Sequence, residues 1–335
     1  MKEWDRMHFY CSDCGRFYPI EGLAYQCDCG GLFKLNKEKD AHVPVTVSLG
    51  EMITPMVRRT LQGRQVWLKV DYMQPTGSFK DRGAFIMMNK LKDLGITEVV
   101  EDSSGNAGAA IAAYCAAAGI KCSIYLPEDT SAGKIKQINA YQADVVKIPG
   151  TRDDVARAIQ KAAETTYYAS HVYNPLFFEG TKSLAFEIYE QVGIPDYVIV
   201  PVGNGTMLLG VFQGFKEIGR IPRIIAVQSE NCAPVYSKFQ HCPTGEIKKT
   251  VAEGIAVGTP KRIDELIAAV KESRGDFITV DDASVTCAQQ LLGSMGFYIE
   301  ATSGAAVAGM LQYFAGAATE RFNIVIPLTG MGLKK

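Results

Sequence analysis

Short runs of β-branched residues alternate with helix-patterned segments along most of this 335-residue chain. Such alternation predicts βαβ units, in which helices cover both faces of a mostly parallel sheet, so an α/β protein is expected. The expected strands are 66–70, 96–101, 122–126, 144–148, 195–202, 221–228, 277–280 and 322–328. The expected helices are 84–94, 109–118, 132–143, 151–165, 183–191, 208–218, 263–273, 284–294 and 301–316.

The composition excludes several kinds of protein. The length allows two domains, and 47% hydrophobic residues are enough for a sizeable core. A formal net charge of −1 gives no electrostatic reason to expect binding to nucleic acid or to a membrane surface. Residues 1–6 lack the apolar core of a signal peptide, and charges or glycines interrupt every apolar run, so no membrane span is expected. Four of the nine cysteines are clustered near the start and five are scattered, which favours a reducing cytoplasm.

The clustered cysteines, Cys11, Cys14, Cys27 and Cys29, predict a structural zinc site. Four thiolates at this spacing can close a tetrahedron, which leaves no open position for catalysis. The second pair is Cys-x-Cys rather than Cys-x-x-Cys, so free thiols or a disulfide remain alternatives. Few basic residues and no recognition helix lie here, so nucleic-acid binding is not expected. Residues 34–41 are polar and are expected to link this segment to the main body.

The stretch Gln74–Gly83, with the sequence QPTGSFKDRG, joins an expected strand to an expected helix. Ser78 is a suitable N-cap residue, with Asp81 in the capping-box position. Lys80 then falls in the first helical turn, where the positive end of the helix dipole destabilises an ammonium group. A lysine that loses its proton readily suits imine chemistry, whereas an arbitrary lysine would extend into water.

Three more turns follow expected strands, at the sheet edge where α/β proteins bind ligands. Ser103–Gly108 offers hydroxyls and N–H groups to a carboxylate or phosphate, or is an ordinary helix start. In Gly203–Met207 the glycines let N–H groups converge on an anion, but the Walker lysine and the full dinucleotide fingerprint are missing. Thr329 offers a hydroxyl to a neutral acceptor such as a ring nitrogen. Together with a reactive lysine, these turns describe a pyridoxal phosphate site.

The motifs PTGSFKDRG, SSGNAG, PVGNGT and LTGMGLK resemble those of threonine synthases, which belong to the tryptophan-synthase-β-like (fold type II) pyridoxal phosphate enzymes. The resemblance runs from about residue 9 to the end of the chain. It implies a homodimer of chains with two doubly wound α/β domains and the active site in the cleft. The implied divisions are a zinc-ribbon-like segment at 1–40, a larger cofactor-binding domain at 41–84 with 166–335, and a smaller substrate-side domain at 85–165.

The resemblance also implies a role for each motif. Lys80 would form the Schiff base with the cofactor and shuttle protons, and Asn106 would meet its phenolic oxygen. The substrate carboxylate would be received by Ser103, Ser104, Gly105, Asn106 and Ala107. The cofactor phosphate would be held by Gly203, Asn204, Gly205, Thr206 and Met207. Thr329 would face the pyridine nitrogen and leave it unprotonated, a weaker electron sink that suits elimination and replacement.

The implied enzyme is a threonine synthase-like lyase, which converts O-phosphohomoserine and water into threonine and phosphate. Phe177 stands where several threonine synthases carry an arginine that binds the substrate phosphate, and phenylalanine cannot do this. Either another cation takes over or the substrate is different. The candidate cations are Lys134, Lys136, Arg152 and Lys182.

Two other functional hypotheses stay open. Within the same family, the chain could be a serine or threonine dehydratase, or a β-replacement enzyme such as a cysteate or cysteine synthase. In a different class, it could be a zinc-ribbon binding protein on a catalytically idle scaffold. His171 has apolar neighbours and is expected to be a packing residue.

Overall fold

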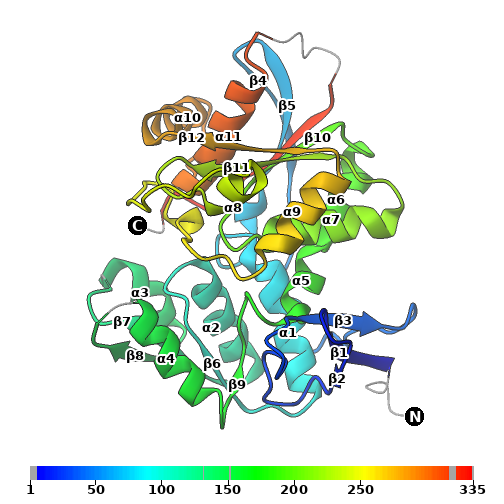
Figure 1. The fold of residues 1–335 in the computed structure, drawn as a ribbon, viewed down its shortest axis with the longest axis vertical. Helices are drawn as coiled ribbons and strands as arrows, with labels where there is room; N and C mark the ends of the chain where they lie inside the picture. The colour runs from blue at the N-terminus through cyan, green and yellow to red at the C-terminus, as the bar shows by residue number, and fades with distance from the viewer. Residues whose placement is uncertain (1–5, 131, 151, 317–321, 334–335) are drawn as a thin grey trace. The chain divides into compact units, whose positions relative to one another are not determined.

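The computed structural model describes residues 6–130, 132–150, 152–316 and 322–333 (Figure 1). The chain forms two compact units, which we call unit 1 and unit 2. Unit 1 comprises residues 1–51 and 80–180, and unit 2 comprises residues 52–79 and 181–335. The chain therefore passes from unit 2 back into unit 1 between Phe79 and Lys80.

Unit 1 contains a parallel sheet in the strand order β8-β7-β6-β9. Val99 shares a hydrophobic cluster with helices on one face, whereas the next residue, Val100, shares another with Ile159 of α4 on the opposite face. Helices therefore cover both faces, as the sequence predicts. The elements are β6 (Glu98–Glu101), β7 (Lys121–Pro127), β8 (Asp144–Ile148), β9 (Tyr167–Tyr168), α1 (Lys80–Asp93), α2 (Asn106–Ala118), α3 (Ala132–Ala140), α4 (Arg152–Ala162) and α5 (Pro175–Thr181).

A small antiparallel sheet, in the order β2-β1-β3, precedes these elements in unit 1. Its strands are β1 (Met7–Cys11), β2 (Phe17–Tyr18) and β3 (Phe33–Lys37). Phe9 and Phe33 are buried in the same cluster as residues of α1 and α2. The expected linker at 34–41 is therefore wrong over its first half, because Lys34–Lys37 pairs with β1.

Unit 2 contains a six-stranded sheet in the order β12-β11-β10-β13-β5-β4, parallel except for the edge strand β4. The strands are β4 (Met56–Leu61), β5 (Arg64–Lys69), β10 (Tyr197–Pro201), β11 (Arg223–Ser229), β12 (Asp276–Val280) and β13 (Ile324–Pro327). The helices are α6 (Ser183–Val192), α7 (Thr206–Ile218), α8 (Pro234–Phe239), α9 (Ile263–Glu272), α10 (Asp282–Ser294) and α11 (Ala301–Tyr313), with 3-10 turns η2 (Asp71–Met73) and η3 (Glu253–Ile255). Side chains of α10 and α11 cluster with Ile199 and Ile225 on one face of the sheet.

The strand register in unit 2 fixes which loops are neighbours. Val198 of β10 pairs with Val325 of β13, and Pro327 of β13 pairs with Lys69 of β5. Since all three strands run parallel, their carboxyl ends lie at one edge of the sheet. The loops that follow β5, β10 and β13 are therefore side by side.

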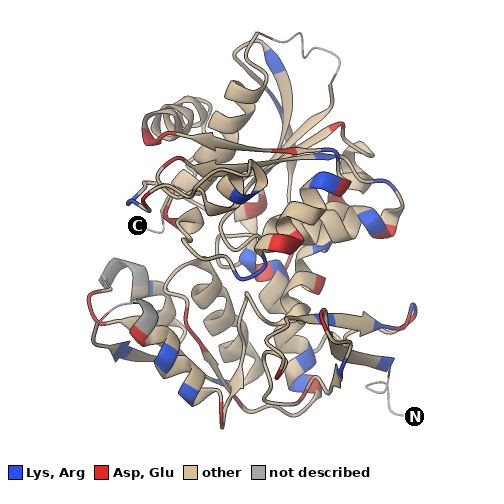
Figure 2. Cartoon of the chain, viewed as in Figure 1, with Lys and Arg blue, Asp and Glu red and all other residues tan. Residues whose placement is uncertain are grey.

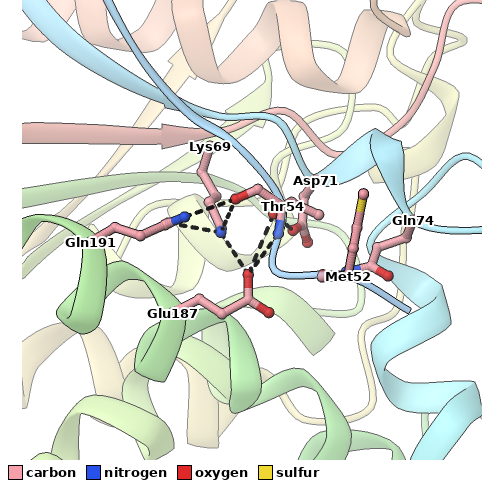
Figure 3. Close-up of polar contacts among 7 residues, drawn as sticks. All are labelled: Met52, Thr54, Lys69, Asp71, Gln74, Glu187 and Gln191. Atoms are coloured by element: carbon pink, nitrogen blue, oxygen red, sulfur yellow. Dashed lines mark hydrogen bonds and ion pairs between the residues drawn. The ribbon is translucent and has the colours of Figure 1, made fainter. Parts of the chain in front are cut away.

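A buried polar cluster holds the end of β5 against α6 (Figure 3). Lys69 is fully buried, and its Nζ lies 2.6 Å from Glu187 Oε2, 2.6 Å from the Thr54 carbonyl and 2.9 Å from Gln191 Oε1. Thr54 Oγ1 donates in turn to Asp71 Oδ1 at 2.8 Å. The strand that leads into the Gln74–Gly83 turn is thus anchored immediately before that turn.

Every expected strand and helix is present, with ends shifted by a few residues. The helix expected over 132–143 stops at Ala140, and Gln142 then adopts a left-handed conformation with φ of 59°. Residue 151 of the expected 151–165 helix lies outside the described residues. Acidic and basic residues are intermixed along both units (Figure 2). None of the described helices is long and apolar enough to cross a membrane.

Candidate active site

Lys80 is the first residue of α1 and is half-buried. The residue before it is fixed within unit 2, where the Phe79 N–H donates to the Thr329 carbonyl at 3.0 Å. The capping-box prediction is wrong, because the Ser78 hydroxyl is buried and makes no hydrogen bond to any described residue. A buried hydroxyl without a partner is rare, so Ser78 marks a place where a ligand could supply one.

The N-terminus of α7 has the form of an anion site. The first intrahelical hydrogen bond of α7 runs from the Leu209 N–H to the Gly205 carbonyl at 2.9 Å. The N–H of Met207 lies before that bond, among the helix-start amides that can bind an anion. Gly205 has φ of 78°, and a Cβ on it would overlap the Leu266 side chain. A Cβ on Gly203 would lie 3.0 Å from Ile255 Cα. Neighbouring atoms leave little room for a side chain at either glycine. Without a side chain, the backbone there can approach a ligand closely.

Thr329 follows β13, beside the loop that follows β10. It is buried, and its Oγ1 donates to Glu300 Oε1 at 2.6 Å and lies 2.9 Å from Ser303 Oγ. The strand register thus brings Thr329 and Gly203–Met207, two of the predicted cofactor contacts, to one edge of the unit 2 sheet. The structure places the predicted hydroxyl and the predicted phosphate loop together.

The predicted carboxylate loop lies in unit 1, between β6 and α2. Gly105 is the N-cap residue of α2, and its N–H donates to Ser103 Oγ at 3.3 Å. Ser103, Ser104 and Asn106 are half-buried and Gly105 is exposed, so a small solute can reach the loop. Lys80 belongs to this unit as well.

Each of these features fits one part of pyridoxal phosphate. An amine at a helix start can hold the aldehyde, a glycine-lined helix N-terminus can hold the phosphate, and a buried hydroxyl can meet the ring nitrogen. The unpartnered Ser78 hydroxyl, two residues from Lys80, is a further observation in favour of a ligand here.

Phe177 is fully buried and packs on the first turns of α1. A Cβ on Gly83 would overlap its ring, and Lys80 Nζ lies 5.5 Å from the ring centroid. The His171 ring meets it edge-on at 5.9 Å between centroids. Phe177 therefore has an aromatic packing role beside the lysine.

His171 also forms a buried pair that the sequence analysis missed. Its Nδ1 lies 2.7 Å from Oε1 of the fully buried Glu101, whose Oε2 makes no hydrogen bond to any described residue. Burial raises the pKa of Glu101 to about 8, and burial together with the Lys80 charge lowers the pKa of His171 to about 3. The prediction that His171 only packs is incomplete. An acidic residue at the end of a buried strand signals an unusual buried group, but it does not identify His171 as the partner of Glu101.

The four clustered cysteines come together in unit 1. Their Sγ atoms all lie within 4.8 Å of one another, with Cys11–Cys29 and Cys14–Cys27 separations of 3.5 Å. A tetrahedral zinc site with Zn–S bonds of about 2.3 Å has sulfurs about 3.8 Å apart. A Cβ on Gly31 would overlap Cys11 Sγ, so the glycine lets the backbone approach the sulfurs.

The chain belongs to the family of pyridoxal-phosphate dependent enzymes, which it matches over residues 47–330. The family expected from the motifs is thereby confirmed. Among curated relatives, the threonine synthase of Methanocaldococcus jannaschii is 32% identical over 97% of this chain and 92% of its own length. The threonine synthase of Synechocystis sp. is 36% identical over 86% of this chain and 78% of its own length. The crystal structure of serine racemase from Dictyostelium discoideum matches with a TM-score of 0.72 and 27% identity, over 84% of this chain and 92% of that one.

Proposed function

We propose that this chain is a threonine synthase, which converts O-phosphohomoserine and water into threonine and phosphate. The observation that carries the proposal is the likeness, over most of the chain, to curated threonine synthases at 32% and 36% identity. The placement of Lys80 at the start of α1 supports it, since that position favours loss of the ammonium proton.

Pyridoxal phosphate would supply an electron sink for a substrate carbanion. Lys80 would hold the cofactor aldehyde covalently, and Asn106 would contact its phenolic oxygen. The cofactor phosphate would be held by the α7 N-terminus, that is, by Gly203, Asn204, Gly205, Thr206 and Met207. Thr329 would meet the ring nitrogen. We propose that residues 41–84 together with 166–335 form the cofactor-binding domain, as the resemblance implies.

The chain's own groups would orient the substrate and move its protons. The Ser103–Ala107 loop would bind the substrate carboxylate through its hydroxyls and the α2 N-terminus, since anions are stabilised there. That contact turns the α-hydrogen toward a base. The Lys80 amine would be that base. It would take the α-hydrogen and a β-hydrogen, so that phosphate can leave from Cγ, and would return protons to Cγ and, after water adds at Cβ, to Cα.

A second candidate is elimination or β-replacement on an amino acid without a phosphate, such as serine or threonine. The buried ring of Phe177 favours it, because a fully buried apolar side chain cannot hold a phosphate. Among the substitute cations, Lys182 is paired with Glu217 at 2.6 Å and Lys136 is exposed. The side chains of Lys134 and Arg152 lie outside those described.

A substrate-profile assay separates the two candidates. With O-phosphohomoserine, equal amounts of threonine and phosphate support the first. Phosphate without threonine, or no turnover, refutes it. Ammonia and a 2-oxo acid formed from serine or threonine support the second. Lys80→Ala should abolish turnover and the visible absorbance of the bound cofactor, and absorbance that survives this change contradicts the assignment of Lys80.

We further propose that Cys11, Cys14, Cys27 and Cys29 bind one structural zinc ion. The sulfur separations support this, because a small adjustment brings them to the spacing of a tetrahedral site. Metal analysis should find about one zinc per chain in the wild type and a large loss in Cys14→Ser. Cys242→Ser changes an exposed cysteine outside the cluster and should keep the metal. Equal zinc in both variants refutes the ligand set.

We also propose a cytoplasmic homodimer. Exposed apolar side chains of unit 2 support a self-association surface, and five of them lie within two residues in sequence of Thr54, Asp71 or Glu187: Met52, Ile53, Met73, Phe186 and Tyr189. Sedimentation should give a dimer for the wild type and a monomer for Ile53→Asp. Ile247→Asp places the same charge at another exposed apolar position of unit 2 and should remain dimeric. A monomeric wild type contradicts the proposal.

A further inference from the structure

Glu101, the last residue of β6, is buried without a full set of hydrogen-bond partners. It is 0% exposed, its Oε1 lies 2.7 Å from His171 Nδ1, and its Oε2 makes no hydrogen bond to any described residue. An ionised carboxylate in this place would leave a charged oxygen unsolvated, which is far less favourable than leaving the carbonyl oxygen of a neutral acid unsolvated. The surroundings therefore favour the protonated acid at Glu101.

The contact between Glu101 Oε1 and His171 Nδ1 needs one proton between the two atoms. In a neutral pair, the acid proton of Glu101 points to a bare Nδ1, and the imidazole carries its own proton on Nε2. The alternatives are a carboxylate against an imidazolium, and a carboxylate against a neutral imidazole with its proton on Nδ1. Both alternatives put a negative charge on Glu101, which the unpartnered Oε2 disfavours.

The charges around the pair act in both directions. The Lys80 charge favours a carboxylate at Glu101 and disfavours an imidazolium at His171, whereas the Asp102 charge favours that imidazolium. Burial outweighs these charges, because it raises the pKa of Glu101 to about 8 and is the largest cause that lowers the pKa of His171 to about 3. Two further titratable groups interact with Glu101 and stay uncharged at neutral pH because burial raises their pKa values: Cys115 of α2 and Tyr168 of β9.

The ring of Phe177 brings the pair close to Lys80. Lys80 Nζ lies 5.5 Å from the centroid of this ring, and the centroid of the His171 ring lies 5.9 Å from it. Phe177 is fully buried, so there is little water here to screen a charge. A carboxylate at Glu101 would hold the proton on the Lys80 ammonium, whereas a neutral pair does not.

We propose that Glu101 and His171 share one proton as a neutral pair and are positioning residues that keep negative charge away from Lys80, so that its amine can act as a base at neutral pH. The proposal rests on the proposed role of Lys80 in the reaction. It requires neither Glu101 nor His171 to touch the substrate. In alkaline solution the pair would lose the shared proton and become anionic, and the Lys80 ammonium would then be harder to deprotonate.

The first test reads the charge of His171 by ¹⁵N NMR of the full chain labelled at histidine. Replacing each of the other three histidines in turn assigns the His171 signals without altering His171, and none of the three is buried: His8, His42 and His241. At pH 7 the His171 signals should be those of a neutral imidazole with its proton on Nε2. An imidazolium, or a neutral ring with its proton on Nδ1, overturns the proposal.

The second test reads the Lys80 amine through its reaction with cyanate, which modifies amines only in their unprotonated form. The full chain is freed of cofactor and treated at several pH values, and carbamylation of Lys80 is measured by mass spectrometry. Glu101→Gln has the shape and the neutrality of the protonated acid, so at pH 7 it should react within about twofold of the wild-type rate. At pH 9 the wild-type pair has lost its proton, and Glu101→Gln should then react faster than the wild type. Glu98→Gln changes a largely exposed carboxylate on the same strand and should match the wild type at both pH values.

Each outcome decides one statement. A Glu101→Gln protein that reacts about tenfold faster than the wild type already at pH 7 shows that Glu101 is ionised there, which overturns the proposal. Equal rates at pH 9 show that the charge of the pair does not reach Lys80, which also overturns it. If Glu101→Gln does not fold, the histidine signals of the chain with Glu101 intact still decide the charge of the pair. Borohydride reduction that fixes no pyridoxal phosphate on Lys80 refutes instead the proposed cofactor site, since the charge of the pair is measured without the cofactor.

Discussion

The ring of Phe177 occupies the space that any side chain on Gly83 would need. Gly83→Ala should therefore lower the free energy of unfolding by about 1–3 kcal/mol, because overpacking strains a filled core. Phe177→Leu on the same chain should recover part of that loss. The measurement is a double-mutant cycle by urea denaturation. Strictly additive effects of the two changes would contradict direct packing.

Phe177→Arg should not create a phosphate site. The guanidinium would enter a fully buried position beside the Lys80 side chain, and an unpaired buried charge lowers stability by several kcal/mol. We expect a lower Tm and no gain in affinity for O-phosphohomoserine. Phe177→Leu is the matched control, with a smaller loss of Tm from the lost ring volume. An arginine variant as stable as the wild type, with a lower KM for the phosphorylated substrate, would show that the pocket accepts the charge.

The Glu101–His171 pair should make stability fall with pH above about 6.5. In the unfolded chain the pKa of Glu101 is near 4.5 and the pKa of His171 is near 6.5. In the folded chain burial raises the pKa of Glu101 to about 8 and lowers that of His171 to about 3. Between pH 4.5 and 6.5 both states hold one proton on the pair, so its contribution is flat. From 6.5 to 8 only the folded state keeps the proton, so the pair's contribution falls, by up to about 2 kcal/mol. Below 4.5 the unfolded state holds two protons, and stability falls again toward pH 3.

Chemical denaturation at a series of pH values tests this dependence. Glu101→Gln removes the group that keeps the proton and should flatten the fall between pH 6.5 and 8. Glu98→Gln changes a largely exposed carboxylate on the same strand and should leave the profile unchanged. A Glu101→Gln profile that matches the wild type would mean that the pair does not hold this proton.

Local pattern made the βαβ layout predictable and singled out the turns that we propose hold the cofactor. Strand and helix periods are visible over five to twelve residues, and Lys80, Gly203–Met207 and Thr329 each sit in a recognisable turn. The Glu101–His171 pair was not predictable, because its members are 70 positions apart and meet through the pairing of β6 with β9. Ser78 was misjudged because a capping pattern says nothing about whether the helix begins one residue later.

Gly205→Ala should weaken cofactor binding more than it weakens the fold. Gly205 has φ of 78° at the start of α7, where a Cβ would also overlap Leu266 and shift the loop. Gly219, at the other end of α7, has φ of 98° and nothing within 4 Å of a built Cβ, so Gly219→Ala carries the backbone strain alone. Gly219→Ala should lose about 1 kcal/mol of stability, and Gly205→Ala should lose more because of the added overlap with Leu266. Only Gly205→Ala should raise the Kd for pyridoxal phosphate, measured by fluorescence titration. Equal Kd values would remove the α7 N-terminus from the cofactor site.

Lys69→Met should destabilise unit 2 by about 3–5 kcal/mol, because it leaves the Glu187 carboxylate partly buried without its cation. The cluster joins β5 to α6 (Figure 3), so the loss should appear as a lower urea midpoint. Lys69→Met with Glu187→Leu removes both charges and should recover much of the stability, since an apolar pair of similar volume needs no desolvation of ions. Lys121→Met removes a lysine that is 62% exposed and ion-paired to Glu98, and it should change stability by less than about 1 kcal/mol. A double variant no more stable than Lys69→Met would show that the hydrogen bonds to Thr54 and Gln191, not the ion pair, hold the strand to the helix.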